Sequence, residues 1–271
     1  MTDTRYWDNL RNVIRTRKGG WQLGKGATSH GYSIIEELMP GCAFASVLIL
    51  NVTGVLPERR LSKWLEASFI ATSWPDPRLW CNYIGALGGS VRATPTASIA
   101  AGTGAADSSI YGPGTIPKAC KFIMEATTEH ASKVPVSDIV ERQVKYRGVP
   151  VVPGYYRPFA QGDERVAPMH SYATEVLGFD EGPHLTMGNR VHDYLACEYR
   201  EGMNLAGYIA AFLSDRGMSA KQIQTLYSLC VNSGVHACYA EQAFDREPGS
   251  FLPLRCDDVE YTGVAPRAID R

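Results

Sequence analysis

Aromatic and cationic side chains gather within residues 151–169, which read VVPGYYRPFAQGDERVAPM. Tyr155, Tyr156 and Arg157 follow a Pro-Gly turn, and Arg165 comes later in the same stretch. A guanidinium group binds a carboxylate or phosphate through two parallel hydrogen bonds, but it holds its proton too tightly for acid–base work. The stretch therefore predicts a site that binds an acidic ligand.

Two carboxylates in the same stretch give these arginines a structural alternative. Asp163 and Glu164 directly precede Arg165. Arg157 and Arg165 would then lie on a rim and form ion pairs with these acids, as exposed charges often do. The two interpretations differ in whether the guanidinium groups face a ligand.

Composition predicts a soluble protein that binds neither nucleic acid nor a membrane surface. The chain has 271 residues and a formal net charge of −1, so no overall field attracts a polyanion. Seven cysteines without a CxxC pair, and six histidines without HExxH spacing, indicate a reduced, cytoplasmic protein without a metal site. The N-terminus lacks the apolar run of a signal peptide, and no apolar run is long enough to span a membrane.

The elements that must position this stretch are predicted to be helices. Ser33 and Glu36 form an S-x-x-E capping box for a short helix that Pro40-Gly41 ends. A helix over 43–52 is followed by Gly54 as its C-terminal glycine.

Apolar residues at helical spacing continue beyond Pro57, from Leu61 to Phe69. Ser219 and Gln222 cap a later helix. Further helices are predicted near 117–131, 137–147, 164–177, 189–201 and 205–217. The only strand predicted is 149–152, so the fold class is all-α.

Four places resemble, in chain order, motifs of the citrate synthase and citryl-CoA lyase superfamily. Residues 31–67 resemble its RGY-x-IEEL…LP opening, and SSIYGPG at 108–114 resembles its GPxHGGA turn. PGYYRPFAQGDERV resembles GFGHxxY…DPRA. Near the end of this chain, MNLAGYIAAFLSDRGM, GVHACYAEQ and EYTG resemble the closing motifs of the superfamily.

The resemblance implies a citrate synthase-like fold with a cleft between two helical domains. It implies a large domain of residues 1–116 and 203–271 and a small inserted domain of residues 117–202. Members are dimers that form or cleave a carbon–carbon bond between an acyl-CoA and a keto acid. We therefore expect a homodimer or a heterodimer with an active homologue, a small-molecule acid and coenzyme A thioester as substrates, and no tightly bound cofactor. Glycine-rich runs at 85–90 and 100–107 would permit tight helix packing.

The sequence departs from the superfamily where its catalytic groups should be. The family's histidines fall on Thr115, on Arg157 and near Trp74, and its catalytic aspartate falls on Ala206. One carboxylate-binding arginine falls near Val231. Loss of a general base alone lowers a rate by about 10²–10⁴, so an efficient citrate synthase is excluded.

The resemblance then suggests which groups could serve an altered site. Arg157 could bind a carboxylate or stabilise a thioester enolate, Asp76 could be a substitute base, and Thr115 could donate a hydrogen bond. The predicted substrate contacts are Arg165, Tyr155, Tyr156, Arg78, Trp74 and Asn204. The structural alternatives are that Asp76 caps the next helix and that Thr115 is a helix N-cap.

Three functions remain open from the sequence. The first is an acyl-CoA enzyme of the same broad type, a transferase or a lyase, with an altered active site. The second is an inactive homologue that binds an acid or acyl-CoA, or regulates a partner. The third is a different reaction in the inherited cleft, such as cyclisation, dehydration or thioester hydrolysis.

Overall fold

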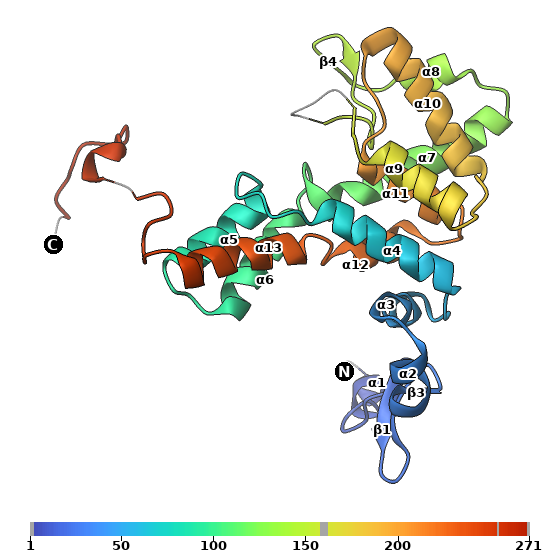
Figure 1. Cartoon of the computed structure of the whole chain (residues 1–271), viewed down its shortest axis with the longest axis horizontal. Coiled ribbons are helices and arrows are strands. Elements are labelled where there is room, and N and C mark those ends of the chain that lie inside the picture. The colour runs from blue at the N-terminus through green and yellow to red at the C-terminus, as the bar shows by residue number, and fades with distance from the viewer. Residues whose placement is uncertain (1–2, 158–161, 254, 270–271) are drawn as a thin grey trace. The chain divides into compact units, whose positions relative to one another are not determined.

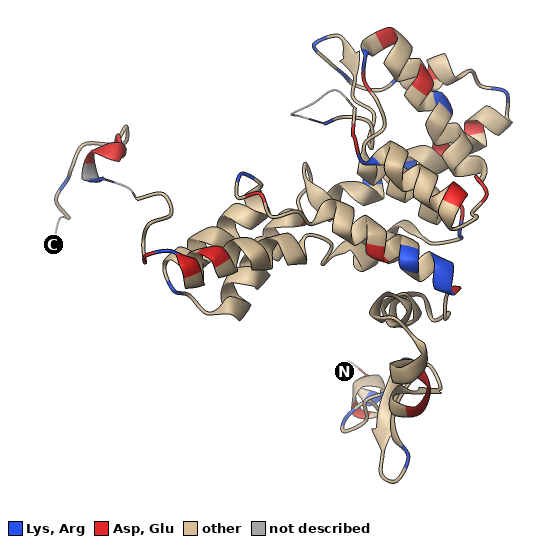
Figure 2. Cartoon of the chain, viewed as in Figure 1, with Lys and Arg blue, Asp and Glu red and all other residues tan. Residues whose placement is uncertain are grey.

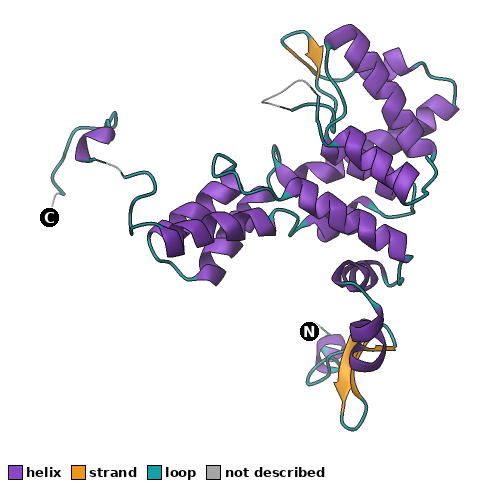
Figure 3. Ribbon diagram, viewed as in Figure 1, coloured by secondary structure: helices purple, strands orange, loops and turns teal. Residues whose placement is uncertain are grey.

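The computed structural model describes residues 3–157, 162–253 and 255–269, and most of its elements are helices (Figures 1 and 3). The helices are α1 Arg5–Asp8, η1 Ile34–Leu38, α2 Met39–Gly41, α3 Phe44–Thr53, α4 Arg59–Thr72, α5 Trp80–Ser90, α6 Pro95–Ala106, η2 Gly112–Thr115, α7 Ile116–Ala131, α8 Val136–Glu141, α9 Val166–Ser171, η3 Tyr172–Val176, α10 Pro183–Tyr199, α11 Leu205–Ser214, α12 Ala220–Tyr227, α13 Asn232–Ala240, η4 Glu241–Asp245 and η5 Cys256–Asp258. The predicted all-α class is confirmed.

The chain divides into two compact units. The first comprises the residues up to Trp74 and Ala106–Val231, and the second comprises Pro75–Ala105 and the residues from Asn232 onward. The predicted small domain, residues 117–202, lies wholly inside the first unit. Its separation from residues 1–116 and 203–271 by a cleft stays a prediction.

Aromatic stacking joins α4 to α11 in the core of the first unit. Trp64 of α4 is 0% exposed, and its ring lies 4.0 Å from that of Phe212 in α11. Tyr208, one turn before Phe212, packs on the same tryptophan. Helices α7, α10 and α11 contact one another around this layer (Figure 1). The buried face that the sequence predicts for the helix after Pro57 is therefore the face that meets α11.

Helix ends follow the predicted caps closely. Gly54 adopts a left-handed φ of 85° after α3 and donates to the carbonyl oxygen of Leu50, as a C-terminal glycine should. Ser219 and Gln222 form the predicted capping box before α12. At η1, Ser33 accepts from the N–H of Glu36, but the carboxylate that returns to the Ser33 N–H is that of Glu37. The wider π-helical turn brings this residue, rather than Glu36, to the cap.

The predicted secondary structure is wrong in two places, although the strand predicted over 149–152 is present in part as β5 Val149–Pro150. The helix predicted over 137–147 ends at Glu141, and a hairpin of β4 Lys145–Tyr146 and β5 Val149–Pro150 follows it. Arg147 and Gly148 both have positive φ angles, 52° and 83°, which suit a two-residue hairpin turn and not a helix.

The second error is a missed sheet. The antiparallel strands β1 Gly19–Gln22, β2 Gly26–Ser29 and β3 Tyr32–Ser33 lie near the N-terminus. These strands are short and rich in glycine, and most of their residues are exposed, so they lack the alternation of apolar and polar residues that identifies a strand in a sequence.

In the second unit, glycines let α5 pack closely against both α13 and α6. A Cβ atom at Gly89 would lie 2.4 Å from the carbonyl oxygen of Tyr239, and one at Gly102 would lie 2.6 Å from that of Cys81. Only glycine permits backbones to approach this closely, so the glycine-rich runs are packing surfaces, as predicted. No charged residue lies within α5, α6 or α13, as Figure 2 shows in tan. In the described part of the chain, no helix combines the length and the apolarity needed to cross a bilayer.

Candidate functional site

The N-terminus of α11 fixes the Pro-Gly-Tyr-Tyr-Arg loop. Asn204 caps α11, because its Oδ1 accepts from the N–H of Gly207 at 3.0 Å. Its Nδ2 donates to the carbonyl oxygen of Tyr156 at 2.7 Å, and its backbone N–H donates to that of Gly154 at 2.8 Å. Asn204, a predicted substrate contact, therefore uses its side-chain oxygen, a side-chain N–H and its backbone N–H to hold the loop against the helix.

Two facing glycines let this loop lie directly on α11. A Cβ atom at Gly207 would lie 2.3 Å from the carbonyl oxygen of Gly154, whose own φ is a left-handed 90°. The loop can therefore follow this path only with glycine at both positions.

The two tyrosines of the loop point to different surroundings. Tyr155 is 3% exposed, and its hydroxyl donates to the carbonyl oxygen of Gly188 at 2.9 Å, while burial raises its pKa. Tyr156 is 53% exposed. Tyr155 therefore anchors the loop in the core, and of the two it is Tyr156 whose ring faces solvent.

Asp163 is the centre of the charged cluster. Its side chain is 0% exposed and accepts from Arg165 Nε at 2.7 Å, Arg165 Nη2 at 2.6 Å and the N–H of Leu205 at 2.9 Å. Arg157 Nη1 lies 3.7 Å from the same carboxylate. Burial raises the pKa of Asp163, but the hydrogen bonds and charge of Arg165 outweigh it, so the pKa is lowered overall. Asp163 thus stays ionised and holds both arginines beside α11.

Arg157 forms its direct ion pair with Glu164. The Arg157 side chain is 20% exposed and the Glu164 side chain 69% exposed. The hydrogen bond that Arg157 donates to the Glu164 carboxylate raises the pKa of Arg157 and lowers that of Glu164. These ion pairs are the ones that the structural alternative predicts, and a ligand-binding role of Arg157 stays a prediction. Residues 158–161 of the same stretch lie outside the described residues.

Arg165 and Trp74, both predicted substrate contacts, lie together. The Arg165 guanidinium is 5.0 Å from the centroid of the Trp74 ring, and its Nη1 is 3.4 Å from the carbonyl oxygen of Ala71. Stacking on an indole and bidentate pairing with Asp163 fix the orientation of this guanidinium.

A groove of about 290 Å³ runs beside this cluster. Helices α4 and α9 form its walls, and its lining is apolar apart from one acid and one arginine. The lining residues are Ala67, Ala71, Glu164, Arg165, Pro168, Met169 and Tyr172. The cluster therefore borders a space that could accept an apolar group.

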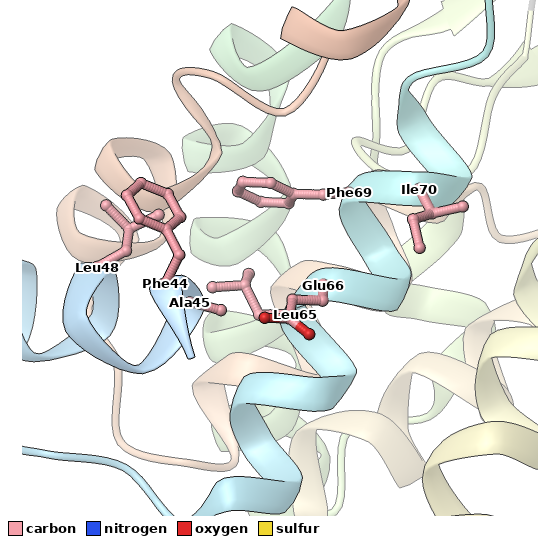
Figure 4. Close-up of a pocket in the computed structure, with 7 residues that line it drawn as sticks. All are labelled: Phe44, Ala45, Leu48, Leu65, Glu66, Phe69 and Ile70. Atoms are coloured by element: carbon pink, nitrogen blue, oxygen red, sulfur yellow. The ribbon is translucent and has the colours of Figure 1, made fainter. Parts of the chain in front are cut away.

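A second pocket, of about 320 Å³, lies between α3 and α4. In Figure 4, the rings of Phe44 and Phe69 and the side chain of Leu48 line it from the two helices. None of the site residues predicted from the sequence lines it.

Asp76 and Arg78 lie in the second unit and pair with each other. Their shortest contact is 2.6 Å, with Asp76 23% exposed and Arg78 89% exposed. The hydrogen bond from the Arg78 side chain lowers the pKa of Asp76, which weakens it as a base. The Asp76 side chain also accepts from the Arg78 N–H at 2.9 Å, and it does not cap α5, so that structural alternative is wrong in detail.

Thr115 ends η2 and precedes α7. Its hydroxyl donates to the carbonyl oxygen of Gly112 at 2.8 Å and makes no capping bond to α7. The expected N-cap bond is therefore absent, because the hydroxyl closes the turn that comes before the helix.

From the sequence, Asp163 is predicted only as an alternative ion-pair partner of the arginines, and its central position in the cluster is not predicted. The Asp-x-Arg spacing of Asp163 and Arg165 is the sequence feature that indicates their ion pair, and Asp76 and Arg78 have the same spacing. Spacing predicts the pair, but it does not predict that one pair is buried against a helix and the other is exposed. Among the described residues, no group of three His, Cys, Asp or Glu side chains could hold a metal ion.

No protein-family model and no curated protein matches this chain. Solved structures do. The citryl-CoA lyase of Hydrogenobacter thermophilus is similar over 96% of this chain and 98% of its own, with a TM-score of 0.79 and 25% identity.

Two further solved structures share the fold at lower identity. The ATP citrate lyase of Methanothrix soehngenii, solved with citrate and coenzyme A, gives a TM-score of 0.74 at 14% identity. The match covers 97% of this chain but 44% of that one. A citrate synthase from Thermoplasma acidophilum gives a TM-score of 0.65 at 13% identity, over 84% of this chain and 59% of that one. By its fold, the chain is a member of the citrate synthase/citryl-CoA lyase-like superfamily.

Proposed function

We propose that this protein acts on a carboxylic acid and a coenzyme A thioester, and that it forms or cleaves a carbon–carbon bond with an altered set of catalytic groups. The similarity to a citryl-CoA lyase over 98% of that chain carries the proposal. The related ATP citrate lyase was solved with citrate and coenzyme A, which supports the substrate classes. Coenzyme A would be a co-substrate and not a tightly bound cofactor.

In this proposal, Arg157 binds the carboxylate of the acid or stabilises a thioester enolate. Its guanidinium lies beside that of Arg165, which Asp163 and Trp74 hold in place. Two adjacent cations suit an anion, since charge-assisted hydrogen bonds are stronger than neutral ones. Tyr156, with its exposed ring, would contact the same ligand.

The proton chemistry would fall to groups outside this cluster. Asp76 is the proposed base, with Arg78 as a neighbouring substrate contact, and Thr115 is the proposed hydroxyl donor. Carbon–carbon chemistry beside a thioester needs such a base and a donor for the enolate oxygen. The lowered pKa of Asp76 makes the proton transfer slow.

Binding without catalysis is the second candidate function. Ala206 lies in α11. The sequence resemblance aligns it with the superfamily's catalytic aspartate, and an alanine transfers no proton. The hydroxyl of Thr115 is already bonded to Gly112, and Asp76 to Arg78. A chain of this kind would bind an acid or thioester as a homodimer, or as the inactive subunit of a heterodimer.

Thermal unfolding with coenzyme A thioesters and with carboxylic acids tests both candidates. A ligand at about 100 times its Kd adds about 2.7 kcal/mol, or about 5–10 °C in Tm for a protein of this size. We expect Arg157→Ala to abolish the shift caused by acids, whereas Arg59→Ala, a change at an exposed arginine of α4, keeps it. A shift that survives Arg157→Ala would refute the binding role.

Mass spectrometry of the same mixtures separates the two candidates. A cleaved or condensed product supports the enzyme. Binding that depends on Arg157 without any product supports the non-catalytic homologue.

A further inference from the structure

The ion pair between Arg157 and Glu164 gives the cluster no net charge. Two guanidinium groups, those of Arg157 and Arg165, face two carboxylates, those of Asp163 and Glu164. A ligand carboxylate can therefore take over the bidentate pairing with Nη1 and Nη2 of Arg157 only if it replaces one of these two acids.

The two acids differ in how firmly they are held. The side chain of Asp163 is 0% exposed and bonded to Arg165 and to the first N–H of α11, so its removal would leave buried donors without an acceptor. Glu164 is 69% exposed and bonded to Arg157 through its carboxylate. Exposed ion pairs contribute about 0–1 kcal/mol, so Glu164 can exchange for another carboxylate at little free-energy cost.

Glu164 also lines the groove between α4 and α9. A carboxylate that takes its place on Arg157 therefore lies at the mouth of that groove. Ala67 and Ala71, one helical turn apart, leave the space open on one side, and Pro168 and Met169 give the other wall.

We propose that Glu164 is an internal competitor for Arg157, and that the acid which displaces it carries a short apolar body that lies in the groove between α4 and α9. The proposal deepens the proposed function and rests on it, because it takes Arg157 as the group that binds the acid. It names a substrate class, keto monocarboxylates with a short apolar chain, and simple alkyl carboxylates serve as binding probes for that class.

Groove size and polarity both favour this class. A volume of about 290 Å³ is at the small end of the roughly 300–1,000 Å³ typical of ligand pockets. An additional carboxylate of a polyacid would lie along a lining that is mostly alanine, proline and methionine, and Arg165, the arginine of that lining, is already paired with Asp163. Burial of an unpaired charge there is unfavourable.

Titration calorimetry with acetate, butyrate, hexanoate and citrate tests the proposal in five proteins: the wild type, Glu164→Gln, Ala71→Leu, Arg157→Ala and the control Glu175→Gln. We expect hexanoate to bind more tightly than acetate or citrate. Glu164→Gln should tighten hexanoate by about two- to fivefold, because it removes the competing charge. Glu175→Gln, the same change at an exposed position of η3 outside the cluster, should leave the affinity unchanged.

Ala71→Leu fills the groove and should weaken hexanoate while leaving acetate unaffected. This selective loss distinguishes a filled groove from a misfolded protein, which would lose both acids.

Failure of the inference and failure of the proposed function give different results. If Arg157→Ala abolishes binding but Glu164→Gln does not tighten it, or if affinity does not rise with chain length, the inference is wrong and the acid-binding role of Arg157 stands. If no acid binds, or if Arg157→Ala binds as the wild type does, the proposed function falls and the inference with it.

Discussion

Replacing Asp163 by asparagine should destabilise the first unit strongly, although the change removes no heavy atom. Asparagine keeps an oxygen that can accept from the N–H of Leu205. It turns an NH₂ group toward the guanidinium of Arg165, so two donors face each other. Arg165 is 22% exposed and cannot recover full hydration.

The size of this effect follows from burial. Breaking a buried ion pair by removing one partner costs about 3–5 kcal/mol. In Asp163→Asn, Arg157 keeps Glu164 as a partner, so only Arg165 loses its carboxylate. We therefore expect the free energy of unfolding to fall by about 3 kcal/mol, the lower end of this range. Asp76→Asn is the matched control, because Asp76 pairs with Arg78 at the same Asp-x-Arg spacing but with Arg78 89% exposed. An exposed pair of this kind should contribute about 0–1 kcal/mol.

Equilibrium unfolding in urea measures both variants. With a slope of about 2 kcal/mol per M, Asp163→Asn should lower the midpoint by about 1.5 M and Asp76→Asn by less than about 0.5 M. The double change Asp163→Asn with Arg165→Gln should recover part of the loss, since it removes the orphaned charge. Equal midpoints for the two single variants would refute the argument that burial of Asp163 sets its importance.

Two further predictions concern the loop on α11 and the pH dependence of stability. Gly207→Ala should destabilise the protein by about 1–3 kcal/mol in urea unfolding, because the added methyl group would overlap the carbonyl oxygen of Gly154. The control Gly104→Ala, in a helix with open space around that position, should stabilise the protein by about 0.5–1 kcal/mol. An unchanged free energy of unfolding in Gly207→Ala would contradict the close approach of the loop to α11. The hydrogen bonds that Lys145 and two tyrosines donate to Glu141 lower the pKa of its carboxyl group from 4.5 to about 2. The stabilisation that Glu141→Gln removes should therefore be fully present above pH 4.5 and should vanish as the pH falls to about 2. A stability difference between wild type and Glu141→Gln that is constant across that window would exclude this ion pair as its source.

Local signals in the sequence predicted the helical elements well. Gly54 and the Ser219–Gln222 pair act within a few residues of themselves, so their bonds form wherever the helix forms. The apolar spacing around Trp64 likewise identified a buried face, which the structure packs on Phe212. The Arg147-Gly148 turn was missed because a short hairpin carries no long-range periodicity.

The candidate site was less predictable, because burial and partner choice depend on tertiary contacts. Tyr155 and Tyr156 are adjacent and of one type, yet one is 3% exposed and the other 53% exposed. Which of them enters the core depends on Gly188 of α10, a residue that the sequence does not associate with the loop. The same holds for Asp163, whose importance comes from the N–H of Leu205 on α11.

The residues that this chain keeps from the superfamily pattern have structural reasons to be there. Asn204 caps α11 and holds the carbonyl oxygen of Tyr156, and Arg165 satisfies the buried Asp163. Their presence therefore follows from the fold and does not require a reaction. Arg157 is different, because its direct partner is the exposed Glu164, and an exposed pair of this kind contributes little stability. Arg157, which the sequence resemblance aligns with a catalytic imidazole of the superfamily, is therefore the residue whose substitution separates a ligand-binding site from a scaffold.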